Sequence, residues 1–156
     1  MNHSQFLKLC RSTSAALDCV DVDELGNTNS IDVDGVNMAL FFDEDFAPDH
    51  ILFYIDIGPL PPFRREEILE RILAINLLTA TKTSGVYGLD KSRDSLIFAQ
   101  HFMSPDLLSG EELAEILKGY SSHANSLKQN LLDPDNLRPI PNILSESLGN
   151  HLQNLA

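Results

Sequence analysis

Three stretches of the chain carry apolar residues at the spacing of an α-helix. They run from about Ser4 to Cys19, from about Phe63 to Ala80, and onward from Ser109. Residues three or four apart share one helix face, so these stretches predict amphipathic helices. The third begins with the capping-box pattern Ser109-Gly110-Glu111-Glu112 and has one narrow apolar stripe, which predicts packing on the surface of a sheet. No residue is expected to cap the first helix.

Five shorter apolar runs predict β-strands. They cover about residues 31–33, 36–42, 50–57, 86–89 and 96–102. Asp34-Gly35 separates the first two runs, and this dipeptide tolerates the positive φ angles of a type I′ hairpin turn. The run from His50 to Ile57 has apolar side chains on both faces, which predicts that both faces are covered. Gly58–Pro62 is expected to end this strand and to start the next helix.

The order of elements defines the expected fold class. Runs of strands separated by helices indicate an α+β domain, α-β-β-β-α-β-β-α, with a twisted antiparallel sheet and flanking helices. We expect this domain to span residues 1–132. Residues 21–30, rich in Asp, Asn and Gly, are expected to form a loop. Prolines interrupt the pattern after Leu132, and residues 133–156 are expected to form a C-terminal tail that is mobile in the free protein.

The predicted helix from Phe63 to Ala80 is apolar on two sides. One row consists of Ile68, Ile72 and Ile75, and the other includes Leu69, Leu73 and Leu77. A surface helix of a monomer usually buries one stripe about 100° wide. The helix is therefore either deeply buried or packed between its own sheet and a second subunit. We favour the second interpretation, because a small domain has few elements with which to surround a helix.

Charge narrows the choice of partners. The chain of 156 residues has 23 acidic and 11 Lys or Arg side chains, a formal net charge of −12. This charge repels phosphates and argues against nucleic acid and anionic membranes as partners. Between Asp18 and Asp49 there are ten acidic residues and no Lys or Arg, which indicates a solvated acidic edge or a surface that steers a basic partner. The chain lacks a membrane-length apolar run and a secretory signal pattern, so a cytoplasmic location is expected.

Metal and redox motifs are weak. Asp21–Asp32 partly matches an EF-hand calcium loop, but Leu25 replaces an oxygen ligand and a strand signal follows instead of the exit helix. Cys10 and Cys19 are too far apart to pair if both lie on one helix, and reduced thiols are expected. Neither feature supports a bound cofactor.

Candidate catalytic residues are scattered as well. The histidines lack the i, i+4 spacing of helical metal ligands, although His50 and His101 would meet if their strands were neighbours. Asp56 is a lone carboxylate in the strongest strand, for which a structural hydrogen bond is expected. There is no nucleophile elbow, phosphate-binding loop or CxxC motif. We therefore expect neither an enzyme nor a cofactor.

Several motifs between Val36 and Leu127 form a combined pattern. They are Phe41-Phe42-Asp43-Glu44, the strand His50–Ile57 followed by Gly58-Pro59-Leu60-Pro61, the helix Ile68–Leu78 with its Leu-x-x-Asn-Leu, Gly85-Val86-Tyr87-Gly88-Leu89-Asp90, and Leu96-Ile97-Phe98. This pattern resembles the Tir chaperone family, the class I chaperones of bacterial type III secretion. Small size and acidity are also typical of that family.

The resemblance implies a non-enzymatic homodimer that binds the N-terminal region of a secreted effector in extended form and keeps it competent for export. The second helix of such chaperones commonly forms the dimer interface, which here implies Ile68, Leu69, Ile72, Leu73 and Ile75. Apolar grooves on the first helix and the open sheet face bind the effector. The candidate effector-binding residues are Phe6, Leu9, Leu17, Phe41 and Phe53.

Two other functions stay open at this point. The first is a dimeric adaptor of the same fold whose partner is not exported. The second is a small ligand-binding protein, which would need a concave polar site that the scattered ionisable residues do not provide. Export of the partner separates the chaperone from the adaptor.

Overall fold

The computed structural model describes residues 1–79 and 85–132. Its helices are α1 (His3–Ala16), α2 (Glu24–Thr28), α3 (Arg65–Thr79) and α4 (Gly110–Leu127), with short turns η1 (Pro62–Arg64), η2 (Pro105–Leu107) and η3 (Lys128–Leu132). Its strands are β1 (Ser30–Val33), β2 (Val36–Phe41), β3 (His50–Pro59), β4 (Val86–Asp90) and β5 (Ser95–Met103). The expected tail, residues 133–156, lies outside the described residues.

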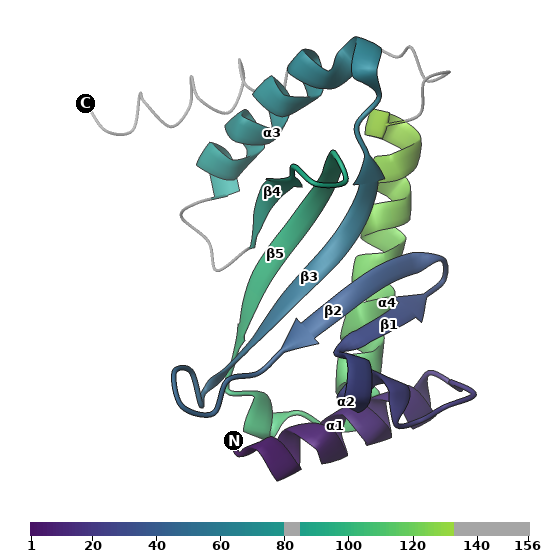
Figure 1. Ribbon diagram of the computed structural model, residues 1–156, viewed down its shortest axis with the longest axis vertical. Helices are drawn as coiled ribbons and strands as arrows, with labels where there is room; N and C mark the ends of the chain where they lie inside the picture. Colours follow the sequence, from purple (N-terminus) through teal and green to yellow (C-terminus); the bar gives the residue numbers. More distant parts are fainter. Residues whose placement is uncertain (80–84, 133–156) are drawn as a thin grey trace.

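The strands form one antiparallel sheet in the order β1-β2-β3-β5-β4 (Figure 1). The expected α+β fold is confirmed. Asp34 and Gly35 both have positive φ angles, 52° and 76°, and join β1 to β2 as the expected tight turn. Consecutive strands are neighbours in the sheet except β3 and β4, which are separated by β5.

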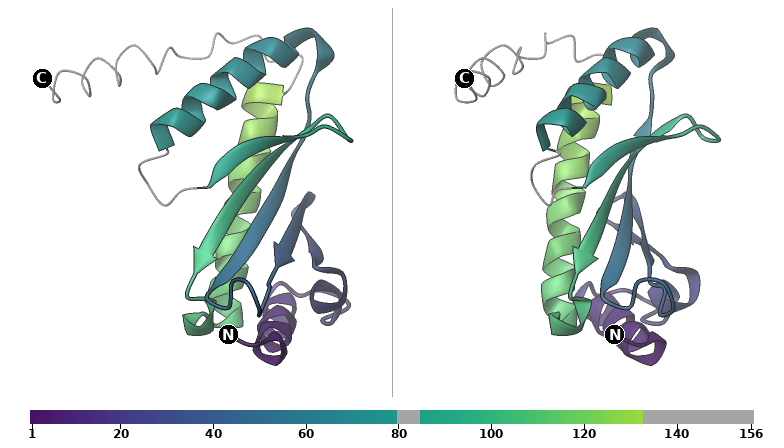
Figure 2. Two further views of the ribbon diagram at one scale, coloured as in Figure 1. Left: turned by 60° about the vertical axis from the view of Figure 1, so that its left-hand side comes forward. Right: turned by 90° about the vertical axis from the view of Figure 1, so that its left-hand side faces the viewer.

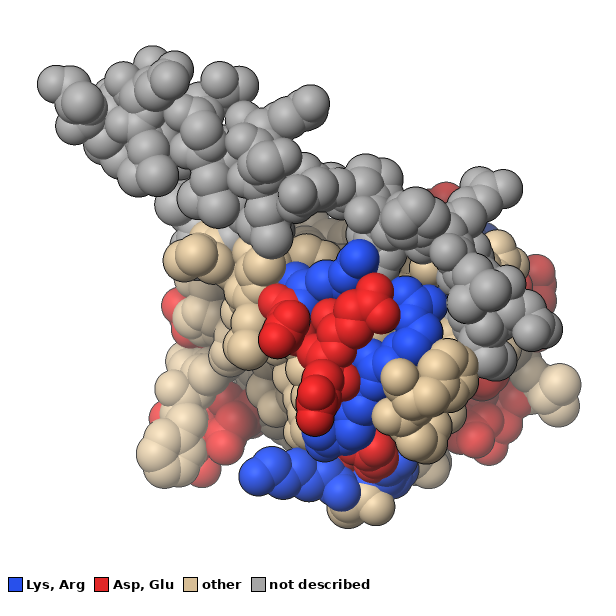
Figure 3. Space-filling model, turned by 90° about the horizontal axis from the view of Figure 1, so that it is seen from above, with Lys and Arg blue, Asp and Glu red and all other residues tan. Residues whose placement is uncertain are grey.

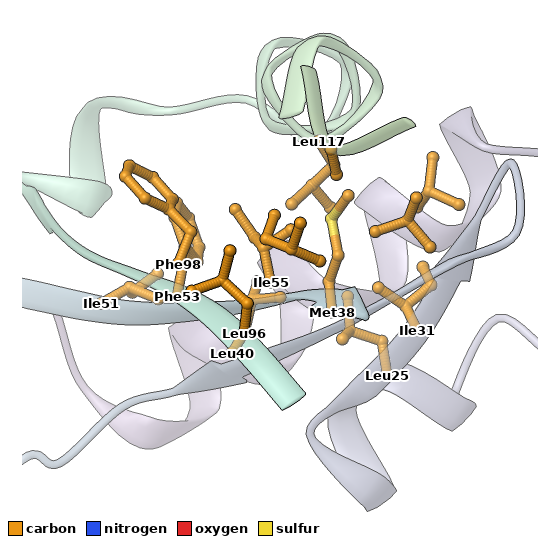
Figure 4. Packing of buried hydrophobic residues seen from close by; sticks show 14 of the residues in the cluster. Leu25, Ile31, Met38, Leu40, Ile51, Phe53, Ile55, Leu96, Phe98 and Leu117 are labelled. Atoms are coloured by element: carbon orange, nitrogen blue, oxygen red, sulfur yellow. The ribbon is translucent and has the colours of Figure 1, made fainter. Parts of the chain in front are cut away.

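The hydrophobic core lies between the sheet and α4. Alternate residues of a strand face opposite sides, so Ile51, Phe53 and Ile55 of β3 all point to the same face. Leu117 of α4 packs over this layer, as Figure 4 shows. Leu113 is fully buried on the same helix, and each such side chain contributes about 1.5–3 kcal/mol when it leaves water. The single stripe of α4 thus packs on the sheet as expected.

The helices cover one face of the sheet. Both views in Figure 2 place α3 and α4 on the same side, with α1 across one end of the molecule. Among the described residues no helix packs on the opposite face, which we call the outer face. The cover expected on the second face of β3 is therefore not supplied by a helix among residues 1–79 and 85–132.

The start of α1 differs from expectation. Asn2 caps the helix: its side chain accepts a hydrogen bond from the Gln5 amide, and the Gln5 side chain accepts one from the Asn2 amide. These two bonds form a capping box that satisfies otherwise unpaired amides. Asn-x-x-Gln is a relative of the Ser-x-x-Glu signature, so the cap was present in the sequence and the expectation of an uncapped start was wrong.

The boundaries of two further segments, residues 21–30 and strand β3, differ from expectation. Residues 21–30 are not all loop, because α2 forms inside them and buries Leu25. Leu25 is the residue of this short helix that enters the core, and Gly26 lies beside Leu7 and Cys10 of α1. Strand β3 continues to Pro59 instead of ending at Ile57, since Gly58 adopts a φ of 127° and allows a bulge between Asp56 and Gly58.

Gly110 sets the distance between α1 and α4. A Cβ atom at this position would lie 2.5 Å from the carbonyl carbon of Ser12 and 2.6 Å from its Cβ. Such distances are far inside van der Waals contact and involve backbone, so α1 would have to move. Gly119, in the middle of the same α4, has no neighbouring atom within 4 Å of its Cβ position.

The two glycines give a matched test of this packing. We expect Gly110→Ala to lower the free energy of unfolding by about 1–3 kcal/mol, because it overpacks the α1–α4 contact. Gly119→Ala should raise it by about 0.5–1 kcal/mol through helix propensity alone. Urea denaturation measures both changes. A stabilising Gly110→Ala would contradict the close α1–α4 contact.

Candidate functional site

The structure separates the candidate effector-binding residues. Phe6 and Leu9 of α1 are buried in the core, Leu17 is half-buried, and Phe53 lies beneath α4 with 1% of its surface exposed. Phe41 is different, since it lies on the outer face with 47% exposed. Strand alternation explains the split, because Phe41 and Phe53 point to opposite faces of the sheet.

The outer face carries an apolar groove around Phe41. Phe41 contacts Tyr54 edge to face, with ring centroids 5.7 Å apart, and Tyr54 is 38% exposed. Tyr54 pairs with Ala39 on one side and Ala99 on the other, and Ala99 pairs with the exposed Val86. Small alanines beside large rings leave a hollow of about 480 Å³.

Gly88 and Ile97 continue the floor of this groove, and they pair with each other across β4 and β5. A Cβ at Gly88 would meet no atom within 4 Å, so the space above it is open. The groove therefore spans β2, β3, β5 and β4, and we call it the outer groove. It resembles a surface for apolar side chains more than a polar catalytic cleft.

A polar cluster closes one end of the outer groove. The Asp56 carboxylate accepts hydrogen bonds from Ser95 Oγ at 2.6 Å and Arg93 Nη1 at 2.9 Å, which confirms the expected structural role of Asp56. Arg93 Nε also donates to Asp90 at 2.7 Å. Hydrogen bonds from Ser92 and then Arg93 hold the pKa of the Asp90 carboxyl well below its usual range. Arg93 thus joins the two carboxylates Asp56 and Asp90 at this end of the groove.

A second groove, of about 610 Å³, lies on the helix side between α4 and β5. Its lining residues are Phe98, Gln100, Phe102, Ile116, Gly119, Tyr120 and His123. Hydrogen bonds join its walls: Tyr120 donates to Gln100, and the Tyr87 hydroxyl lies 2.9 Å from His123 Nε2. Burial raises the pKa of both tyrosines, so both hydroxyls keep their protons. The helix-side groove is more polar than the outer groove, and side-chain hydrogen bonds connect its walls.

The two apolar rows of α3 face different ways. Ile68 and Ile72 are buried against the chain's own core, and Ile75 is partly buried. In the other row Leu69 is partly buried, whereas Leu73 is 69% exposed. Leu77 is equally exposed, at 68%. The outward row therefore presents leucines to solvent at i and i+4 spacing, and Figure 3 shows opposite charges interspersed over the end of the molecule near α3.

Ion pairs account for much of that charged surface. Glu67 pairs with Arg64 at 3.1 Å and with Arg71 at 3.2 Å, and Arg65 pairs with Asp94 at 3.2 Å. The hydrogen bond from Arg64 lowers the pKa of the Glu67 carboxyl. Each of these pairs has at least one side chain that is 45% or 46% exposed, and such pairs contribute little stability each. The charged side chains are thus paired with one another, and the exposed leucines form an apolar strip on the outward side of α3.

Asn76 joins α3 to the edge of the sheet. Its Nδ2 donates to the Tyr87 carbonyl at 2.9 Å, and its Oδ1 accepts from the Tyr87 amide at 2.8 Å. Tyr87 belongs to the edge strand β4, whose outer backbone groups would otherwise be unpaired. One amide side chain thus replaces a neighbouring strand at this residue. Sequence reasoning noted the Leu-x-x-Asn-Leu motif but missed this contact, because nothing in the spacing shows that Asn76 faces β4.

The calcium-like string does not gather its carboxylates. Asp23 lies 3.5 Å from Arg11, Asp21 accepts a hydrogen bond from the Asp23 amide, and Leu25 is buried. Among residues 1–79 and 85–132 no three His, Cys, Asp or Glu side chains come close enough to hold a metal ion. Cys10 is buried, and burial raises the pKa of its thiol to about 12, so it is an apolar core residue. Over the same residues, no helix has both the length and the apolar composition that crossing a bilayer requires.

A sheet with helices on one face and an apolar groove on the other has the surface of a protein-binding domain. The profile of the Tir chaperone protein (CesT) family matches residues 24–128, which is more than half of the chain. The chain therefore belongs to this family, as the sequence motifs indicated. A comparison with curated proteins finds no match.

Two solved structures share the fold. The ExsC–ExsE complex superposes with a TM-score of 0.66 at 16% identity, over 85% of this chain and 97% of that chain. The HopA1–SchA chaperone–effector complex gives a TM-score of 0.52 at 17% identity, over 83% of this chain and 98% of that chain. At such low identity these likenesses establish the architecture alone.

The contact between Asn76 and β4 leads to a stability prediction. We expect Asn76→Ala to lower the free energy of unfolding by about 1–3 kcal/mol, because the Tyr87 amide and carbonyl lose their partners. Asn125→Ala is the control, since the Asn125 side chain donates one exposed hydrogen bond to Asp34 at 3.2 Å and should cost less than about 0.5 kcal/mol. Urea denaturation compares them. Equal effects would mean that Asn76 does not protect the strand edge.

Proposed function

We propose that this protein is a type III secretion chaperone that binds the N-terminal segment of a secreted effector on its outer groove. Membership of the Tir chaperone family supports the chaperone role. The observation that carries the choice of surface is the apolar outer face, which no described helix covers. The chaperone acts in the cytoplasm without enzymatic activity and holds its client in an export-competent, unfolded state.

The outer groove suits an extended client segment. It crosses four strands, its floor includes the small residues Ala39, Gly88 and Ala99, and the exposed rings of Phe41 and Tyr54 line it. Alternate side chains of an extended segment point the same way, so bulky apolar residues can enter the hollows while polar ones stay in water. Of the five candidate effector-binding residues, Phe41 is the one we place in direct contact with the client.

The buried candidates take an indirect role in this proposal. Phe53 and Leu9 are buried in the core, and the Phe6 ring stacks on Phe42 with centroids 5.3 Å apart. Leu17, half-buried at the end of α1, extends the apolar surface only slightly. The second groove is the competing client site, but its hydrogen-bonded walls offer fewer free apolar positions.

The proposed chaperone is a homodimer through α3. Leu73 and Leu77 are the exposed residues of the outward row, which begins at the partly buried Leu69. The row Ile68, Ile72 and Ile75 anchors the helix to its own subunit. Leucines spaced four apart and exposed to this degree are costly to leave in water, and a second copy of the same row buries them symmetrically. An adaptor with a non-exported partner would use the same surfaces, and secretion of the partner decides between the two functions.

The client surface is tested by filling each groove separately. Gly88 and Gly119 lie one in each groove, and both have open space where a side chain would begin. We expect Gly88→Leu to weaken binding of the client's N-terminal segment at least tenfold, because leucine occupies the outer groove. Gly119→Leu should leave the affinity within about twofold.

The client for this test is the protein that co-purifies with the chaperone and is lost from the culture medium when the chaperone is deleted. Isothermal titration with its N-terminal segment measures the affinity, and circular dichroism checks that both variants are folded. Loss of binding in Gly119→Leu with normal binding in Gly88→Leu would place the client in the helix-side groove instead.

The dimer is tested on the outward row of α3. Wild-type protein should have a mass near twice 17.3 kDa by light scattering coupled to size exclusion. Leu73→Glu should give a folded monomer, because a carboxylate in an apolar interface loses its hydration. Leu107→Glu replaces an equally exposed leucine in η2, far from α3 in the chain, and should stay dimeric. A wild-type monomer at micromolar concentration would refute the proposed interface.

A further inference from the structure

The sheet brings two histidines together that are far apart in the chain. His50 begins β3 and His101 lies near the end of β5, and these two strands are paired. His101 pairs with Leu52, and His50 pairs with Met103, so the two histidines are diagonal neighbours. Both belong to the outer-face set of their strands, because the alternate residues Ile51 and Phe53 face the core.

The geometry of this pair matches a metal chelate. The imidazole rings are perpendicular, with centroids 5.8 Å apart. Two imidazoles bound to one tetrahedral zinc ion at about 2.0–2.1 Å hold their centroids roughly 5–5.5 Å apart. The observed separation of 5.8 Å is therefore close to that of two imidazoles bound to one ion.

Asp49 supplies the second feature of a metal site. Its carboxylate lies 2.8 Å from His50 Nδ1 and accepts that hydrogen bond. The bond fixes the proton on Nδ1, leaves a lone pair on Nε2, and orients the ring. Histidines that bind metals in proteins are commonly held by a carboxylate in this way.

The geometry points to a binding site for a divalent transition ion such as Zn²⁺, with His50 and His101 as ligands and Asp49 as the residue that positions His50. Two protein ligands leave the other coordination positions to water, so the absence of a three-residue cluster among the described residues is compatible with the site. Imidazole ligands favour zinc, nickel and copper over magnesium. The proposal is independent of the client surface, because every readout uses the protein alone.

Titration calorimetry with ZnCl₂ on the full chain tests the site. A Cys19→Ser background removes the partly exposed thiol, a competing zinc ligand. We expect one Zn²⁺ per chain, and at least tenfold weaker binding in His50→Gln and in His101→Gln. Asp49→Asn should weaken binding by roughly tenfold, the effect typical of a lost supporting carboxylate. His123→Gln, whose ring contacts Tyr87, is the matched control and should bind normally.

A second readout follows from the position of the site between two strands. Zinc bound to both histidines ties β3 to β5 and should raise the midpoint of thermal unfolding with increasing concentration, whereas Mg²⁺ should not. Either histidine substitution should abolish the shift. Zinc affinity that is unchanged in both histidine variants, or no binding by the wild-type chain, would overturn the proposal.

Discussion

The sheet has apolar side chains on both faces, but the described helices pack on only one of them. Leu113 and Leu117 of α4 cover the inner residues of β3, such as Phe53 and Ile55, and α3 covers the end of the same face with Ile68 and Ile72. Phe41, Tyr54 and Val86 stay partly in water on the other face. An uncovered apolar face of this kind marks a binding surface on a protein that must remain soluble. In the proposed chaperone, the net charge of −12 would help to keep this face from associating before a client binds.

Helix α3 likewise has apolar residues on two sides, of which the chain's own core covers only one. Its isoleucine row meets the chain's own core, and Asn76 fastens the helix to the edge of β4. If α3 rotated about its axis to bury the outward leucines, Asn76 would lose both hydrogen bonds to Tyr87. In the proposed function, the exposed leucines pair with a second copy of the chain, whereas the outer groove binds the client.

Much of this fold could be predicted from the sequence. The five strands and three long helices follow from apolar periodicity, and the Asp34-Gly35 turn follows from residues that tolerate positive φ. The face of the sheet that the helices cover could not be predicted. The sequence shows that Phe41 and Phe53 are both apolar, but it does not show which of them faces the helices. Two of the wrong predictions concern local features. The Asn2 cap follows the Asn-x-x-Gln pattern in the sequence, whereas the only buried residue of the short helix α2 is Leu25. The meeting of His50 and His101 required the strand order, which no local pattern specifies.

The most direct measurement is site-specific photo-crosslinking in the cell that encodes the protein. p-Benzoylphenylalanine placed at Phe41 probes the outer groove, and the same residue at Phe46, 91% exposed in the loop before β3, probes a surface outside it. The proposed client surface predicts an adduct from position 41 that maps to the N-terminal segment of a type III-secreted protein, and none from position 46. An adduct to that segment from position 119 in the helix-side groove, with none from position 41, would contradict it.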